Sequence, residues 1–106
     1  MSGNFVVIMV MCATRAEARK ISDRLLKKRL VACANIISGV ESKFWWKGKL
    51  DNAAEILLMI KTTKANFKKI EAEVRRAHSY EIPEIIAVPV SAGSKKYLGW
   101  VEENVK

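Results

Sequence analysis

The sequence is poor in the residues that mark several common protein classes. Its 106 residues include one histidine, two cysteines, two prolines and five glycines. Two cysteines are too few for the disulfide framework of a small secreted domain, and the low proline and glycine content excludes collagen-like and linker-like chains. With a single histidine, no nucleophile elbow and no glycine-rich phosphate loop, acid–base and covalent catalysis find no support. We therefore expect a protein that is not an enzyme.

Long hydrophobic runs are also missing. The most apolar segment, residues 5–12, is far shorter than the ~20 residues that a membrane helix needs. No basic segment precedes it and no small-residue cleavage pattern follows it, so we expect neither a membrane anchor nor a signal peptide. We expect both cysteines to be reduced thiols, and these features together predict a cytoplasmic protein.

Hydrophobic residues, in contrast, make up half of the chain. This fraction excludes an intrinsically disordered protein, and the length fits one domain with one core over residues 1–106. The formal net charge is +8, from 19 basic and 11 acidic residues. The basic residues recur along the expected helices with acidic residues between them, which is typical of solvated helix faces. We therefore expect neither nucleic acid nor a membrane as a partner.

Hydrophobic periodicity predicts four strands. Residues 5–11 are apolar without a polar face, which indicates a strand buried on both sides. Alternation over 31–47 and the apolar run in 52–61 predict a hairpin around Lys47-Gly48-Lys49, with a bulge or bend at Gly39. Residues 84–90 form the last strand, and Pro89 within it favours an edge position because proline cannot donate to the ladder.

Capping residues predict where three helices begin. Thr14 and Glu17 form a capping box before a helix of about four turns. Thr62-Thr63 is expected to cap a second amphipathic helix that reaches residue 77, and Ser94 a short C-terminal helix.

The predicted order, βαββαβ with an additional C-terminal helix, is an α+β, ferredoxin-like fold with a long hairpin between the second and third strands. In this topology the first and third strands are central and the helices cover one face of the sheet. The strands, however, do not alternate polar and apolar residues as a sheet with one wet face should. We therefore expect another copy of the same chain to cover the second face.

Short segments along nearly the whole chain match one known family in order. They are 16–18, 29–35, Ser42-x-Phe44-x-Trp46-x-Gly48, Glu55 with Lys61-Thr62-Thr63, His78-x-Tyr80-Glu81-x-Pro83-Glu84-Ile85 with Pro89, and Tyr97-Leu98-x-Trp100. With them the chain resembles the CutA1 family of divalent-cation tolerance proteins. The resemblance implies a homotrimer that binds copper or a related divalent ion, and it associates Cys12 and His78 with metal binding.

The residues themselves leave two interpretations of each candidate ligand. Copper favours thiolate, thioether and imidazole ligands, but none of these residues has the spacing of a known metal motif. Cys12 is either a ligand or a small buried hydrophobe at a strand end. His78 is either a ligand or a residue that ends a helix. For Cys33, Met9 and Met11 we favour core packing.

Two other functions stay open. One is a trimeric regulatory module similar to the PII signalling proteins, which would bind a small anionic ligand in subunit clefts lined by Lys61. The other is nucleic-acid binding driven by the charge, in which Phe44-Trp45-Trp46 would stack on bases. Because these aromatic residues lie near a hairpin tip, we favour their packing against a neighbouring subunit. For Tyr80, Glu81 and Glu84 we favour loop and subunit contacts over catalysis.

Overall fold

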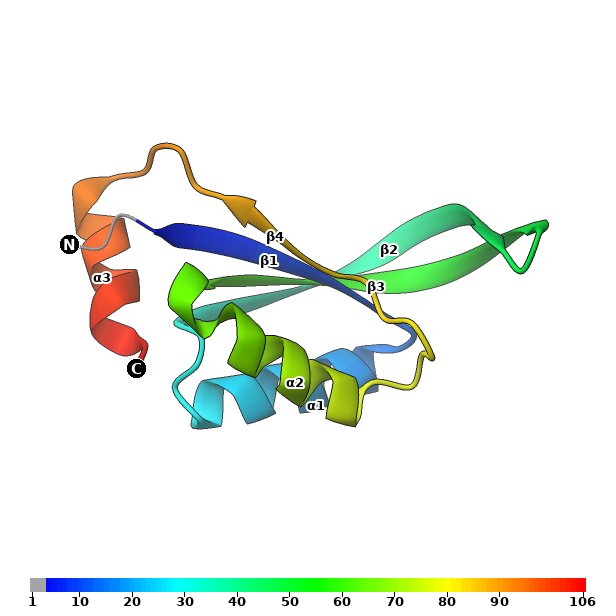
Figure 1. Ribbon diagram of the computed structural model, residues 1–106, viewed down its shortest axis with the longest axis horizontal. Helices are drawn as coiled ribbons and strands as arrows, with labels where there is room; N and C mark the ends of the chain where they lie inside the picture. Colours follow the sequence, from blue (N-terminus) through cyan, green and yellow to red (C-terminus); the bar gives the residue numbers. More distant parts are fainter. Residues whose placement is uncertain (1–3) are drawn as a thin grey trace.

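The structure, a computed structural model, describes residues 4–106, and within them the chain forms four strands and three α-helices (Figure 1). In chain order the elements are β1 (Phe5–Cys12), α1 (Arg15–Lys27), β2 (Cys33–Trp46), β3 (Lys49–Thr63), the short 3-10 helix η1 (Lys64–Asn66), α2 (Phe67–Ala77), β4 (Ile85–Pro89) and α3 (Lys95–Asn104). The strands are ordered β2-β3-β1-β4 with antiparallel neighbours. The ferredoxin-like α+β prediction is confirmed, with β1 and β3 central and the proline-containing β4 at an edge.

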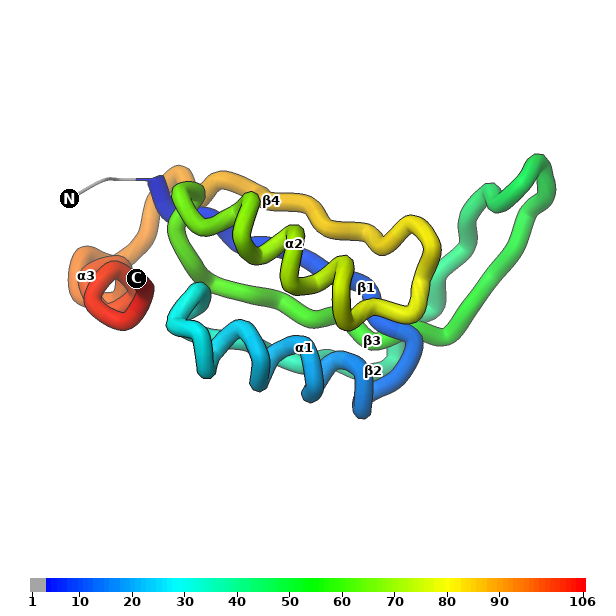
Figure 2. The backbone as a smooth tube through the Cα atoms, turned by 60° about the horizontal axis from the view of Figure 1, so that its bottom comes forward, coloured from blue at the N-terminus to red at the C-terminus, as the bar shows by residue number. Residues whose placement is uncertain are grey.

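Helices α1 and α2 lie side by side on one face of the sheet, and α3 lies at its end (Figure 2). The core forms between the sheet and helices α1 and α2. Its fully buried side chains alternate along β1 and β3 and recur on the inner sides of α1 and α2: Ile8, Val10, Leu58, Ile60, Ile21, Leu25, Ile70 and Val74. Burial of such a side chain contributes about 1.5–3 kcal/mol, so this layer supplies much of the free energy of folding.

The opposite face of the sheet is also apolar, as the lack of alternation predicted. Val7, Met9 and Met11 occupy the positions of β1 between the core residues and therefore point to the other side. Met9 pairs across the strands with Met59 of β3 and Ile86 of β4. At the sheet edges Ile37, Ile86 and Val88 are 41%, 47% and 43% exposed. Neither α1 nor α2 covers this face (Figure 2).

Strands β2 and β3 continue beyond the helices as a projecting hairpin (Figure 1). The strand pairing shifts between Ile37 and Val40, where Gly39 has a φ of +86°, so the predicted bulge is confirmed. At the tip Lys47 and Gly48 have φ of +50° and +80°, as a tight hairpin turn with two left-handed residues requires.

Two of the three predicted helix caps are confirmed. The hydroxyls of Thr14 and Ser94 accept hydrogen bonds from the backbone N–H groups of Glu17 and Tyr97, at 3.1 and 3.0 Å. The prediction that Thr62-Thr63 caps the second helix is wrong. β3 continues through both threonines, and the buried Thr62 hydroxyl donates to the Leu30 carbonyl at 2.7 Å. This buried carbonyl is a tertiary acceptor that local sequence rules do not reveal.

Within the described residues, no helix is long and apolar enough to cross a bilayer.

Candidate metal centre

Three side chains with metal-binding chemistry meet where β1 ends. Cys12 is the last residue of β1, Glu17 lies in the first turn of α1, and His78 directly follows α2. Their ligand atoms all lie within 4.8 Å of one another. Among residues 4–106, this is the one group in which at least three His, Cys, Asp or Glu side chains lie close enough to share a metal ion. The fold thus places the two predicted ligands together and adds a carboxylate.

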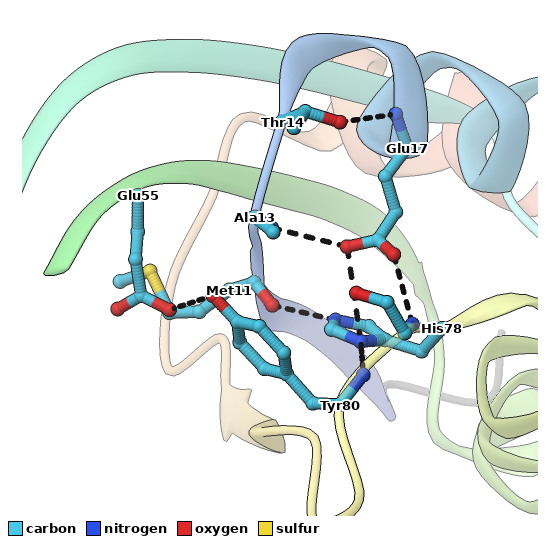
Figure 3. Close-up of polar contacts among 8 residues, drawn as sticks. Met11, Ala13, Thr14, Glu17, Glu55, His78 and Tyr80 are labelled. Atoms are coloured by element: carbon cyan, nitrogen blue, oxygen red, sulfur yellow. Dashed lines mark hydrogen bonds and ion pairs between the residues drawn. The ribbon is translucent and has the colours of Figure 1, made fainter.

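His78 is held in one tautomer by its neighbours (Figure 3). Nε2 lies 2.6 Å from the carbonyl oxygen of Met11, which can only accept, so Nε2 carries the proton. Nδ1 then has a lone pair and accepts the backbone N–H of Tyr80 at 3.1 Å. The side chain is fully buried, and Nδ1 also lies 3.8 Å from Glu17 Oε1. Nδ1 is therefore the atom available to a metal ion.

Glu17 is fixed as a carboxylate by backbone donors. Oε1 accepts the N–H of Ala13 at 3.0 Å and Oε2 accepts the N–H of Ser79 at 2.8 Å. Burial alone would raise the pKa of Glu17, but the hydrogen bonds from Ser79 and Ala13 outweigh it and lower the pKa below its usual value. The predicted capping box is thus modified, because Glu17 reaches the N–H of Ala13 and not that of Thr14.

Cys12 is a protonated thiol at neutral pH. Its side chain is fully buried, and burial, followed by the nearby carboxylates of Glu17 and Glu55, raises the pKa of the thiol to about 12. A metal ion would reverse this preference, since a cation beside the sulfur stabilises the thiolate and binding then releases the proton.

The three residues fit a divalent metal ion in chemistry and spacing. Thiolate, imidazole and carboxylate are ligands of Zn²⁺ and Cu²⁺. Such ligand atoms lie about 2.0–2.3 Å from the ion, so atoms already within 4.8 Å of one another need only a small closing movement. To coordinate, Cys12 must lose its proton and His78 Nδ1 must exchange the Tyr80 N–H for the metal.

A second polar pair lies beside this group. The hydroxyl of Tyr80 donates to Glu55 Oε2 at 2.7 Å, and its ring lies 4.7 Å from that of His78, centroid to centroid (Figure 3). Burial, the hydrogen bond to Glu55 and nearby negative charge raise the pKa of Tyr80, so the phenol stays a hydrogen-bond donor. Tyr80 therefore connects the candidate metal centre to the base of the hairpin.

A family model described as "CutA1 divalent ion tolerance protein" matches residues 6–104. The chain belongs to the CutA1 family. The divalent-cation tolerance protein CutA of Archaeoglobus fulgidus is 40% identical over 97% of this chain and 98% of its own length. The chain spans 57% of another relative, the rice protein CutA 1, chloroplastic, at 34% identity.

Solved CutA1 structures have the same fold. The Cut A1 protein of Thermus thermophilus superposes with a TM-score of 0.94 at 36% identity, covering 96% of this chain and 99% of that one. The "periplasmic divalent cation tolerance protein CutA" from Archaeoglobus fulgidus gives 0.93 at 38% identity, covering 96% and 99% of the two chains. The predicted membership of the CutA1 family is therefore confirmed over nearly the whole chain.

Two other residues singled out from the sequence, Cys33 and Lys61, lie away from the CutA1 metal candidate. Cys33 is half-buried at the far end of the sheet, where it pairs across the strands with Lys61. Lys61, proposed to line an anion-binding cleft, donates to the side-chain oxygen of Asn35. Met9 and Met11 lie on the apolar face away from the helices.

Glu17 is the candidate ligand that sequence reasoning missed. It was identified only as part of a capping box, yet the same motif held the signal. A capping glutamate turns back toward the residues before its helix, and here those residues follow directly on Cys12.

Proposed function

We propose that this CutA1 protein is a homotrimeric, non-enzymatic protein that binds copper or a similar divalent cation and acts in divalent-cation tolerance, with Cys12, Glu17 and His78 as ligands. The observation that carries the proposal is the approach of a thiol, a carboxylate and an imidazole to within 4.8 Å at the end of β1. The description of the family as divalent ion tolerance proteins also supports a divalent cation as the ligand.

The surroundings of the three residues support a binding role over catalysis. His78 is oriented by the Met11 carbonyl, which fixes Nε2 as the protonated nitrogen and leaves Nδ1 for the ion. Glu17 is already ionised, so a cation has a fixed negative charge to approach. Because the thiol proton leaves when the ion binds, affinity should increase with pH.

A calorimetric titration of the metal-free protein with Cu²⁺ and Zn²⁺ tests this proposal. We expect one site per chain and an affinity at least ~10-fold lower in Cys12→Ala, Glu17→Gln and His78→Ala. Even the loss of a residue that only hydrogen-bonds to a metal ligand typically lowers metal affinity about 10–100-fold. Cys33→Ala is the matched control, because it removes the other thiol at the far end of the sheet. Equal affinity in the wild type and the Cys12 and His78 variants would remove the ligand assignment.

The homotrimer is supported by the apolar sheet face that α1 and α2 leave uncovered, which another copy of the chain would cover. The cytoplasm remains our proposed location, supported by two cysteines that are both free thiols. The alternative function, a PII-like module for an anionic ligand, is not favoured by the CutA1 relatives, and its candidate Lys61 is already engaged by Asn35.

A further inference from the structure

The imidazole nitrogen that could coordinate a metal ion already accepts a hydrogen bond. Because Nε2 of His78 carries its proton toward the Met11 carbonyl, Nδ1 is the ring nitrogen with a lone pair. That lone pair accepts the backbone N–H of Tyr80 at 3.1 Å. One lone pair cannot accept a hydrogen bond and coordinate an ion at the same time. The Tyr80 N–H must therefore leave Nδ1 for His78 to act as a ligand.

The neighbouring contact of Glu17 creates no such conflict. Oε2 of Glu17 accepts the backbone N–H of Ser79 at 2.8 Å. A carboxylate has about four lone-pair sites on its two oxygens, so it can keep this hydrogen bond and still coordinate an ion. Of the two consecutive N–H groups that reach the candidate ligands, the one that competes with metal binding is that of Tyr80.

Tyr80 is also held at its other end. Its hydroxyl donates to Oε2 of Glu55 in β3 at 2.7 Å, and Glu55 is buried. Figure 3 shows both contacts, with the backbone nitrogen of Tyr80 at the His78 ring and its hydroxyl at Glu55. A hydrogen bond to a carboxylate is stronger than one between two neutral groups. The bond to Glu55 therefore favours the arrangement in which the Tyr80 N–H stays on Nδ1.

The backbone around Tyr80 offers little further restraint. Among the residues that the structure describes, none of 79–83 takes part in a hydrogen bond between backbone groups. The side chains of Glu17, Glu55 and His78 hold the segment instead. A segment without such backbone bonds opens at a lower free-energy cost than a strand or a helix. The bond to Glu55 is thus a restraint that one substitution can remove without changing a candidate ligand.

We propose that Tyr80 regulates the candidate metal centre by competing with the metal ion for Nδ1 of His78, and that its hydrogen bond to Glu55 sets the strength of this competition. The inference rests on the proposed metal-binding function. A protein whose binding-competent state is only partly populated has an apparent affinity reduced by that fraction. Tyr80, a positioning residue, therefore lowers the affinity of the wild type for the ion.

Calorimetric titration of the metal-free full chain with Zn²⁺ tests the competition in Tyr80→Phe. This variant keeps the aromatic ring, the backbone N–H and the charge of Glu55, and it loses the hydroxyl. We expect it to bind Zn²⁺ about 10-fold more tightly than the wild type, the effect of losing a hydrogen bond to a charged group. A merely structural role predicts weaker binding. Tyr97→Phe, the same change at the other tyrosine, is the matched control and should leave the affinity unchanged.

Amide hydrogen exchange of the wild type, followed by NMR, gives a second readout that needs no variant. Zn²⁺ should accelerate exchange of the Tyr80 N–H, because this group loses its acceptor. The N–H of Ala32, which donates to the Lys61 carbonyl at the far end of the sheet, should not exchange faster. This measurement keeps the test valid if Tyr80→Phe fails to fold.

The outcomes separate this inference from the proposed function. If the wild type binds Zn²⁺ but Tyr80→Phe binds it no more tightly, the competition is overturned and the metal-binding function stands. The same holds if Zn²⁺ binds and leaves the Tyr80 N–H as protected as before. If neither protein binds Zn²⁺, the proposed function is wrong and the competition by Tyr80 is wrong with it.

Discussion

The His78 imidazole donates a hydrogen bond from Nε2 to the carbonyl oxygen of Met11 at 2.6 Å, joining residues that are 67 positions apart. The bond ties the loop after α2 to the end of β1 and sets the tautomer of the ring. It also places Tyr80 beside the base of the hairpin, because the backbone N–H of Tyr80 binds the other ring nitrogen. One buried side chain thus organises both the candidate metal centre and the start of the loop that leads to β4.

Replacement of His78 should therefore destabilise the protein even without metal. His78→Ala leaves the Met11 carbonyl and the Tyr80 N–H without partners, which costs about 1–3 kcal/mol for a buried group. Urea denaturation in EDTA measures this change in the free energy of unfolding. Arg75→Ala, an exposed position three residues earlier, serves as the control and should change stability little. An unchanged midpoint for His78→Ala would contradict the structural role of the imidazole.

Cys12 should resist alkylation in the folded protein. The thiolate is the reactive form, and a pKa of about 12 leaves almost none of it at pH 8. We expect a Cys33→Ser variant, in which Cys12 is the remaining thiol, to react with iodoacetamide at least ~100-fold more slowly when folded than in urea. The rate should increase as the pH rises toward 12, provided that the protein stays folded. Rapid reaction of the native thiol at pH 8 would show that Cys12 is neither buried nor perturbed.

The confirmed helix cap at Thr14 can be distinguished from the failed one at Thr63 by substitution. Thr14→Ala removes an N-cap hydrogen bond and should cost about 1 kcal/mol of unfolding free energy. Thr63→Ala should cost much less, because the Thr63 side chain makes no capping bond. Denaturation of both variants at one protein concentration provides the measurement. Equal losses would mean that the difference in capping has no energetic consequence.

These caps also show which features the sequence could reveal. The strand over 5–11, the edge position of Pro89, the turn at Gly48 and the caps at Thr14 and Ser94 follow from rules that operate within a few residues. The error at Thr62-Thr63 arose because the acceptor that binds Thr62 is the carbonyl of Leu30, which is distant in sequence. Local rules describe donors and acceptors that are close in sequence, so they do not predict a partner 32 positions away.

Local sequence rules could not predict the candidate metal centre for the same reason. Cys12 and His78 are far apart in the chain, and only the resemblance to CutA1 connected them, because their spacing matches no metal motif. The capping box explained Glu17 locally, although its carboxylate also closes the site by accepting the N–H of Ser79. The packing of α2 beside α1 brings the residues together, and that packing is a tertiary property.

Acid should weaken the contact between the two helices through Glu73. Oε1 of this buried carboxylate forms an ion pair with Nε of Arg24 in α1 at 2.5 Å. Its Oε2 forms ion pairs with Lys28 Nζ and Arg76 Nη1 at 3.1 Å each. The hydrogen bonds from Arg24 and Lys28 lower its pKa below the ordinary 4.5. A carboxyl group with a lowered pKa stabilises the folded state above its unfolded pKa, and this contribution is lost as the pH falls below about 4.5.

A Glu73→Gln variant should therefore be less stable than the wild type at pH 7, and the difference should shrink at pH 3. Urea denaturation at both values measures it. Glu71→Gln on the same helix is the control, because the partly exposed Glu71 forms one ion pair within residues 4–106, with Lys68 at 4.0 Å. A stability difference for Glu73→Gln that is the same at pH 3 and pH 7 would exclude this charge network as the cause.

The proposed trimer makes a prediction about two apolar side chains of similar exposure on opposite layers. Ile86 is 47% exposed on β4, next to the uncovered apolar face, and Leu26 is 40% exposed on α1. If copies of the chain pack through the sheet face, Ile86→Arg places a charge in that contact, where an unpaired buried charge is strongly destabilising. Leu26→Arg places the same charge on the solvated helix layer.

Sedimentation velocity should then show a trimer for the wild type and for Leu26→Arg, and smaller species for Ile86→Arg. A monomeric wild type, or an intact trimer in Ile86→Arg, would show that the apolar face serves some other contact.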